Sequence, residues 1–142
     1  MPISISPEMM REIIMDHYNT PNNKKTPAEP KDFQVIHMDS TSCIDDIYVY
    51  VKLKNDIIDD ICFDGVACAI ATSSTDIMCD LMRGKTKAEA NYIITQYKAM
   101  IHEEKYDDSV LDEALVFINT SKQAARIKCA TIGWNALTEL IK

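Results

Sequence analysis

Residues 47–68 read IYVYVKLKNDIIDDICFDGVAC, and this stretch decides the fold. Its first part places an apolar residue at every second position from Ile47 to Leu53, which is typical of a strand buried on one face. Asn55-Asp56 is a turn signal, and a second apolar run follows over residues 57–63. The two runs therefore predict an antiparallel β-hairpin, whose second strand is closed by Asp64-Gly65.

Upstream of the hairpin, the sequence predicts a helix and one more strand. Ser6 and Pro7 suit the N-cap and the first turn of a helix. Residues 32–38 have the composition of a further strand, which would give a sheet of about three strands. The expected apolar stripe of the helix consists of Met10, Ile13, Ile14 and Tyr18.

Downstream of the hairpin, the pattern is helical. Residues 68–83 form one predicted helix that Gly84 ends, and Thr86–Glu89 is a capping box that opens the next. We expect a short helix from Ser109, with Leu111, Ala114, Leu115 and Ile118 facing inward, and a last helix that begins near residues 126–129.

These elements predict an α+β fold in a single domain over residues 1–142. About three mainly antiparallel strands would pack with helices on one face, with an N-terminal helix and a helical C-terminal half.

The composition excludes several classes of function. The chain has 142 residues and a net charge of −7, which does not suit binding to nucleic acid or to an anionic membrane surface. It shows no basic and apolar leader, and no apolar run of the roughly 18 residues that a membrane span needs. We expect a cytoplasmic location, where thiols stay reduced.

Five cysteines occur, an odd number spread over most of the chain. In a reducing compartment such a set favours metal or thiol chemistry over a disulfide framework, although five small buried hydrophobic residues are an equally simple interpretation. No C-x-x-C motif occurs, which argues against a thiol–disulfide oxidoreductase. Cys62 and Cys79 lie among apolar residues and are predicted to belong to the core, and His17, His37 and His102 have no spacing typical of metal ligands.

The other three cysteines lie at positions that suit metal binding or a reactive thiolate. Cys43 and Asp45 form a C-x-D pair in a polar loop before the hairpin, and Cys68 opens a helix, whose positive N-terminal end favours the thiolate. Cys129 lies near the expected start of the last helix, where the cations Arg126 and Lys128 would lower the pKa of the Cys129 thiol. If the three thiols and the carboxylate converge, they suit zinc or an iron–sulfur cluster.

Five segments, in order and at consistent spacing, resemble the IscU/SufU family of iron–sulfur cluster assembly proteins, which is similar to the N-terminal part of NifU. The resemblance covers residues 9–137. IscU-type members carry a histidine directly before the last cysteine, where this sequence has Lys128, and the long stretch from Gly84 to Cys129 resembles the insertion of the SufU branch. The five segments are residues 13–22, 43–45, 63–74, 84–86 and 126–131, the last of them followed by Trp134.

The resemblance to the SufU branch implies zinc held by Cys43, Asp45, Cys68 and Cys129. It implies that Cys43 accepts persulfide sulfur from a SufS-type cysteine desulfurase, as in a zinc-dependent sulfurtransferase, with Arg126 as a cation at the edge of the site. Downstream iron–sulfur assembly proteins or apo acceptor proteins would receive the sulfur or cluster. Two alternatives stay open: a scaffold that assembles and transfers a [2Fe–2S] cluster on the same four residues, and a structural zinc module for protein interactions.

The sequence departs from the family pattern at two glycines. Ile44 stands between Cys43 and Asp45, and Ala67 stands before Cys68. A β-branched residue strongly resists a positive φ, so if the family loop needs that conformation, we expect Cys43 and Asp45 to be displaced or strained here.

Overall fold

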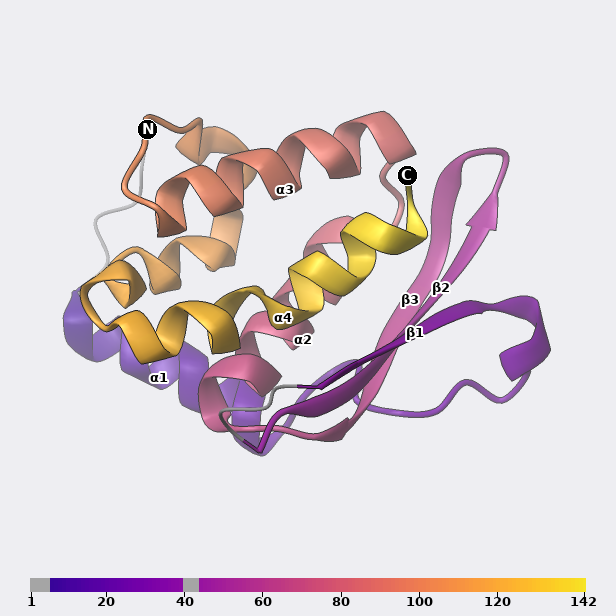
Figure 1. Cartoon of the computed structure of the whole chain (residues 1–142), viewed down its shortest axis with the longest axis horizontal. Helices are drawn as coiled ribbons and strands as arrows, with labels where there is room; N and C mark the ends of the chain where they lie inside the picture. The colour runs from indigo at the N-terminus through magenta and orange to yellow at the C-terminus, as the bar shows by residue number, and fades with distance from the viewer. Residues whose placement is uncertain (1–5, 40–43) are drawn as a thin grey trace.

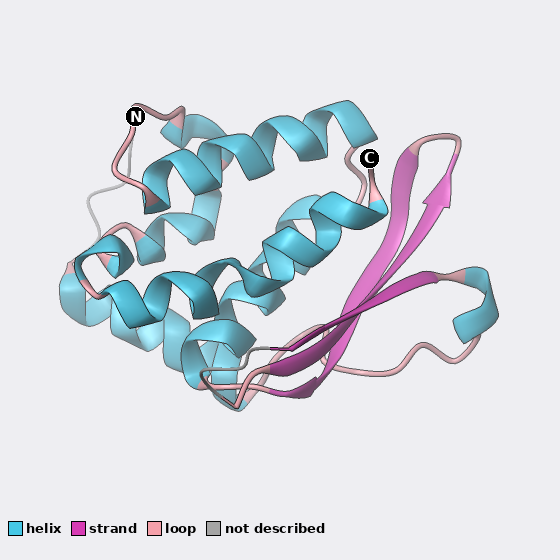
Figure 2. Cartoon of the chain, viewed as in Figure 1, coloured by secondary structure: helices cyan, strands magenta, loops and turns pink. Residues whose placement is uncertain are grey.

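The computed structural model describes residues 6–39 and 44–142. Its layers are a three-stranded sheet and a set of helices that cover one face of that sheet (Figures 1 and 2). The strands form an antiparallel meander in the order β1-β2-β3. In chain order the elements are α1 (Pro7–Asn19), the 3₁₀ helix η1 (Pro30–Asp32), β1 (Gln34–Asp39), β2 (Asp46–Lys54), β3 (Ile57–Val66), α2 (Ala69–Met82), α3 (Lys87–Ile101), the 3₁₀ helices η2 (Asp108–Val110), η3 (Asp112–Phe117) and η4 (Thr120–Lys122), and α4 (Ala124–Leu140).

The β2–β3 pair confirms the antiparallel hairpin that the alternating apolar residues predict. Asn55 and Asp56 both have positive φ angles, 54° and 62°, which is the backbone of the two-residue hairpin turn that matches strand twist. The alternating residues Ile47, Val49 and Val51 are buried against the helices. In the helical layer, α2 packs against β3, and α4 packs against β1 and β2.

Helix caps form where the sequence predicts them. The Ser6 hydroxyl accepts the Met9 N–H at the start of α1, and Thr86 and Glu89 form the reciprocal capping box of α3. Cys68 is the N-cap of α2.

The structure corrects three local predictions. On α1, Tyr18 is 40% exposed and the neighbouring His17 is the buried side chain. The expected short helix at Ser109 is a series of 3₁₀ turns, and Ile118 at its end is 38% exposed. Strand β3 does not stop at residue 63 but continues to Val66.

Gly65 explains this extension. Its φ is 122°, a region that side chains other than glycine rarely adopt, and it pairs with Ile47 on β2. A Cβ atom here would lie 2.2 Å from the Asp46 carbonyl oxygen. Glycine therefore lets β3 approach the beginning of β2, next to Asp45.

Candidate metal centre

Asp45, Cys68 and Cys129 come together in the structure, although they are far apart in the sequence. One ligand atom of each lies within 4.8 Å of the others. Asp45 immediately precedes β2, Cys68 caps α2, and Cys129 lies in the second turn of α4. Cys43, the fourth predicted ligand, lies outside the described residues.

The Asp45 carboxylate is 2% exposed and is held against Cys68. Its Oδ1 accepts the Cys68 backbone N–H at 2.8 Å, and its Oδ2 lies 3.8 Å from the Cys68 Sγ. A buried carboxylate needs such partners, because burial without them costs several kcal/mol. One oxygen is thus anchored to the backbone while the other faces the thiol.

The Cys68 side chain acts as a helix cap. Its Sγ accepts the Ala71 N–H at 3.4 Å, and the backbone of Cys68 is extended. This position confirms the prediction that Cys68 opens a helix. Ala67, which replaces the family glycine, does not have a positive φ, so the backbone at this position does not require glycine.

Cys129 differs from the prediction in its electrostatics. The thiol is 7% exposed, and burial raises its pKa well above the ordinary range, helped by the neighbouring Asp45 and Cys68. The expectation that Arg126 and Lys128 lower this pKa is wrong, because both cationic side chains extend into water while the thiol is buried. Cys129 also lies five residues after Ala124, the first residue of α4, beyond the strongest effect of the helix end.

The donor set fits a tetrahedral zinc ion. Zinc–sulfur bonds of about 2.3 Å and zinc–oxygen bonds of about 2.0–2.2 Å place a tetrahedral sulfur and oxygen ligand about 3.6 Å apart. The separation between Cys68 Sγ and Asp45 Oδ2 is 3.8 Å, and all three ligand atoms lie within 4.8 Å of one another. Small side-chain rotations would therefore close these donors around one ion, and the same thiolates suit iron–sulfur chemistry.

Cys62 and Cys79 belong to the core, as predicted. Both side chains are buried. Burial raises the pKa of Cys62 to about 11 and that of Cys79 well above its usual range, so neither thiol is set up as a nucleophile.

A second polar cluster centres on His17, which the sequence did not single out. The Asp76 carboxylate lies 2.5 Å from its Nδ1, and the Glu113 carboxylate lies 2.7 Å from its Nε2. Because carboxylates only accept hydrogen bonds, both ring nitrogens donate and the ring is an imidazolium. The Asp76 hydrogen bond is the main cause that raises the pKa of His17 from 6.5 to about 9.

The side chains of His17, Asp76 and Asp80 are close enough together to hold a metal ion. Their hydrogen bonds to other protein groups explain this arrangement without a metal. Asp76 also accepts the backbone N–H groups of Asn22 and Asn23, and the Asn23 side chain donates to Asp80. The cluster thus ties the end of α1 and the turn after it to α2. The only sequence signal was the histidine just before the asparagine-rich turn.

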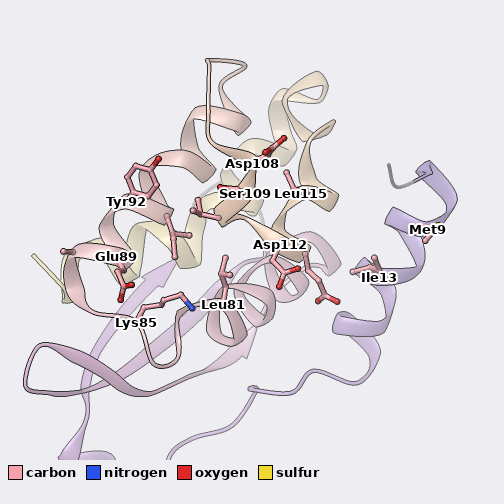
Figure 3. A pocket seen from close by; sticks show the side chains of 14 residues that line it. Met9, Ile13, Leu81, Lys85, Glu89, Tyr92, Asp108, Ser109, Asp112 and Leu115 are labelled. Atoms are coloured by element: carbon pink, nitrogen blue, oxygen red, sulfur yellow. The ribbon is translucent and has the colours of Figure 1, made fainter. Parts of the chain in front are cut away.

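A groove of about 1050 Å³ opens between α1, α3 and the 3₁₀ turns (Figure 3). Met9 and Ile13 lie on one side of it, and Glu89 and Tyr92 lie on the other. Its lining residues do not include the three converging residues, so this groove is separate from the metal centre.

Comparisons with known proteins agree with the fold. Residues 9–139 match the NifU-like N-terminal domain family. The zinc-dependent sulfurtransferase SufU of Bacillus subtilis is 36% identical over 130 residues, which are 91% of this chain and 86% of that protein. The iron–sulfur cluster assembly scaffold protein IscU of Streptococcus pyogenes is 33% identical over 92% of this chain and 80% of its own.

A solved structure extends the likeness to three dimensions. It is that of a Fervidobacterium islandicum protein assigned as an iron–sulfur cluster assembly scaffold of the SUF system, and it superposes with a TM-score of 0.85 at 27% identity. The match covers 92% of this chain and 95% of that one. Within the part of the chain that the structure describes, no helix is long and apolar enough to cross a membrane.

Proposed function

The chain belongs to the NifU-like N-terminal domain family of iron–sulfur cluster assembly proteins, and we propose that it acts there as a zinc-bound sulfur acceptor. The observation that carries this proposal is the convergence of Asp45, Cys68 and Cys129. Three separate elements deliver two thiols and a carboxylate to one point, which core packing alone does not require.

Cys43 is the proposed fourth ligand and the sulfur-accepting thiol. It precedes Asp45 by two residues in the sequence, as a C-x-D pair. Three thiolates and one carboxylate complete a tetrahedral zinc site. A carboxylate is a harder and more readily displaced ligand than a fourth thiolate, which suits a site whose ligands exchange.

Each residue of the proposed site has its own role in sulfur transfer. Bound zinc would keep the buried thiols as thiolates at neutral pH, against the burial that raises the pKa of Cys129. The Cys43 thiolate attacks the outer sulfur of the desulfurase persulfide. A new S–S bond forms on Cys43, the S–S bond of the donor breaks, and the desulfurase cysteine leaves as a thiolate. Asp45, Cys68 and Cys129 stay in place as ligands.

Two features favour the sulfur acceptor over a cluster scaffold. The Bacillus subtilis relative is named a zinc-dependent sulfurtransferase. In addition, Lys128 stands directly before Cys129, and it is exposed. A lysine ammonium has no lone pair to offer a metal, unlike a neutral histidine. Arg126 is three residues before Cys129 on α4 and is proposed as the cation at the edge of the site.

The proposed partners are a SufS-type cysteine desulfurase and, downstream, iron–sulfur assembly or apo acceptor proteins in the cytoplasm. The second candidate function is a scaffold for a [2Fe–2S] cluster on the same four residues, which the relatives named IscU favour. It predicts visible charge-transfer absorption after anaerobic reconstitution with iron and sulfide.

The test combines metal analysis with a desulfurase assay. The protein should hold about one zinc per chain and should raise the turnover of a SufS-type desulfurase, and Cys43→Ala should abolish that increase. Cys62→Ala is the matched control, because this buried cysteine lies outside the site. If Cys43→Ala stimulated the partner as well as the unaltered protein does, Cys43 would not be the acceptor.

A further inference from the structure

Helices α2 and α4, which carry Cys68 and Cys129, pack against each other (Figure 1). Thr75 follows Cys68 by seven residues, about two helical turns, and Gly133 follows Cys129 by four, about one turn. Each of these residues therefore lies on the same face of its helix as the cysteine. The contact between Thr75 and Gly133 therefore lies in the α2–α4 interface, about two turns along α2 from Cys68 and about one turn along α4 from Cys129.

This contact leaves no room for a larger residue. A Cβ atom on Gly133 would lie 2.4 Å from the Thr75 Oγ1 and 2.9 Å from its Cγ2. Real Cβ atoms essentially never make contacts under 3.0 Å, so either the Thr75 side chain or one helix against the other would have to shift. The three heavy atoms nearest to this added Cβ all belong to the Thr75 side chain.

A buried set of hydrogen bonds fixes the same pair of helices along their axes. The Ala130 carbonyl, directly after Cys129, accepts the Ser74 hydroxyl at 2.7 Å and the Tyr97 hydroxyl at 2.8 Å. The Trp134 Nε1 donates to the Ser74 Oγ at 2.9 Å, and the Tyr97 and Trp134 rings stack 3.8 Å apart. All of these side chains are buried. One carbonyl of α4 is therefore held by both α2 and α3.

We propose that Gly133, Thr75 and the hydroxyl of Tyr97 are positioning residues that set the Cys68–Cys129 separation and thereby the metal affinity. This inference rests on the proposed function of the site. Ligand distances in a zinc site lie within about 0.2 Å of their usual values, and a shift of α4 against α2 changes how far the Cys68 and Cys129 side chains must rotate to meet them. Mutation of residues that orient metal ligands typically lowers the metal affinity by roughly 10- to 100-fold.

The test is a double-mutant cycle at the contact. Gly133→Ala should weaken Co²⁺ and Zn²⁺ binding roughly 10- to 100-fold, whereas Thr75→Ala should change it by less than about threefold. The double variant should recover most of the lost affinity, because it removes the Thr75 Oγ1 and Cγ2 that obstruct the new methyl group. Affinity is measured by competition with a chromophoric chelator, and the Co²⁺–thiolate absorption bands report the ligand geometry.

The matched control is Gly84→Ala. Gly84 has a φ of 87° but no atom within 4 Å of an added Cβ, so the change strains the backbone without touching the helix contact. It should lower the thermal unfolding temperature of the metal-free protein and leave the Co²⁺ bands unchanged. A general loss of stability and a specific loss of metal geometry are thereby separated.

Tyr97→Phe gives a second, conservative arm should Gly133→Ala not fold. It keeps the ring stacked on Trp134 but removes one of the two hydroxyls that hold the Ala130 carbonyl. The Co²⁺ affinity should fall at least about threefold, with altered absorption bands. Wild-type affinity and bands in Tyr97→Phe and Gly133→Ala, or no recovery in the double variant, would overturn the positioning role. Failure of the proposed function would give a different result: the wild-type protein would contain no zinc as purified and would not stimulate a desulfurase. The comparison of Co²⁺ affinities among the variants depends on neither of these two observations.

Discussion

Both carboxylate oxygens of Asp45 contact Cys68, the N-cap of α2. Oδ1 accepts the Cys68 backbone N–H at 2.8 Å, and Oδ2 lies 3.8 Å from the Cys68 Sγ. This pair connects the start of β2 to the cap of α2 and sets two ligands of the proposed metal site relative to each other. One Asp45 oxygen thus supports the fold, and the other is available to the proposed metal ion.

Changing Asp45 to asparagine should separate these two roles. The amide oxygen can still accept the Cys68 N–H, but the ligand is no longer an anion, so we expect zinc affinity to fall tenfold or more with little loss of stability. Chelator competition and urea unfolding measure the two effects. Asp46→Asn is the control, because Asp46 is exposed and pairs with His37; a weaker zinc site in that variant, with Asp45→Asn unaffected, would refute the assignment.

The His17 cluster should make stability depend on pH. The pKa of His17 is raised from 6.5 to about 9 in the folded protein, so its contribution is fully present below pH 6.5 and is lost as the pH rises through about 9. We expect His17→Gln to be less stable than the wild type at pH 6, by on the order of 2 kcal/mol, and the difference to shrink by pH 9.5. Urea unfolding at several pH values measures it.

His102→Gln is the matched control for that experiment. His102 is exposed at the end of α3, and its replacement should leave the pH dependence of the wild type intact. A difference between His17→Gln and wild type that did not change between pH 6 and pH 9.5 would show that His17 is not an imidazolium in the fold.

Gly65→Ala should destabilise the protein more than Gly84→Ala does. Both glycines have positive φ angles, 122° and 87°, but only at Gly65 would the new methyl group also meet a backbone atom, the Asp46 carbonyl oxygen at 2.2 Å. We expect a cost above about 2 kcal/mol at Gly65 and about 1 kcal/mol at Gly84, measured by urea unfolding. Equal costs would mean that the approach of β3 to β2 can relax.

Removal of the metal should leave the fold intact. The core of buried apolar residues spans the sheet and all of the larger helices except α1, which only packs against it, so metal ligation is not needed to hold the layers together. After treatment with a chelator, we expect the far-ultraviolet circular dichroism to persist and the unfolding temperature to fall by an amount that depends on the zinc concentration. An unfolded metal-free protein would instead support the structural zinc module.

The sequence predicted those features that depend on neighbouring residues. The turn at Asn55-Asp56 and the capping box at Thr86 need only local geometry, and both appear in the structure. The electrostatics of Cys129 did not follow from its neighbours, because burial by other elements outweighs two exposed cations. Likewise, the partners of His17 lie 59 and 96 residues away, and no local pattern marks them.

The most direct test of the central claim is zinc K-edge X-ray absorption on the purified protein. The four-residue site predicts about one zinc per chain, with three sulfur ligands at about 2.3 Å and one oxygen ligand at about 2.0–2.2 Å. One sulfur should be lost in Cys68→Ala and none in Cys79→Ala, since Cys79 is buried in the core. A zinc shell made only of nitrogen and oxygen, or a sulfur count unchanged in Cys68→Ala, would contradict the account.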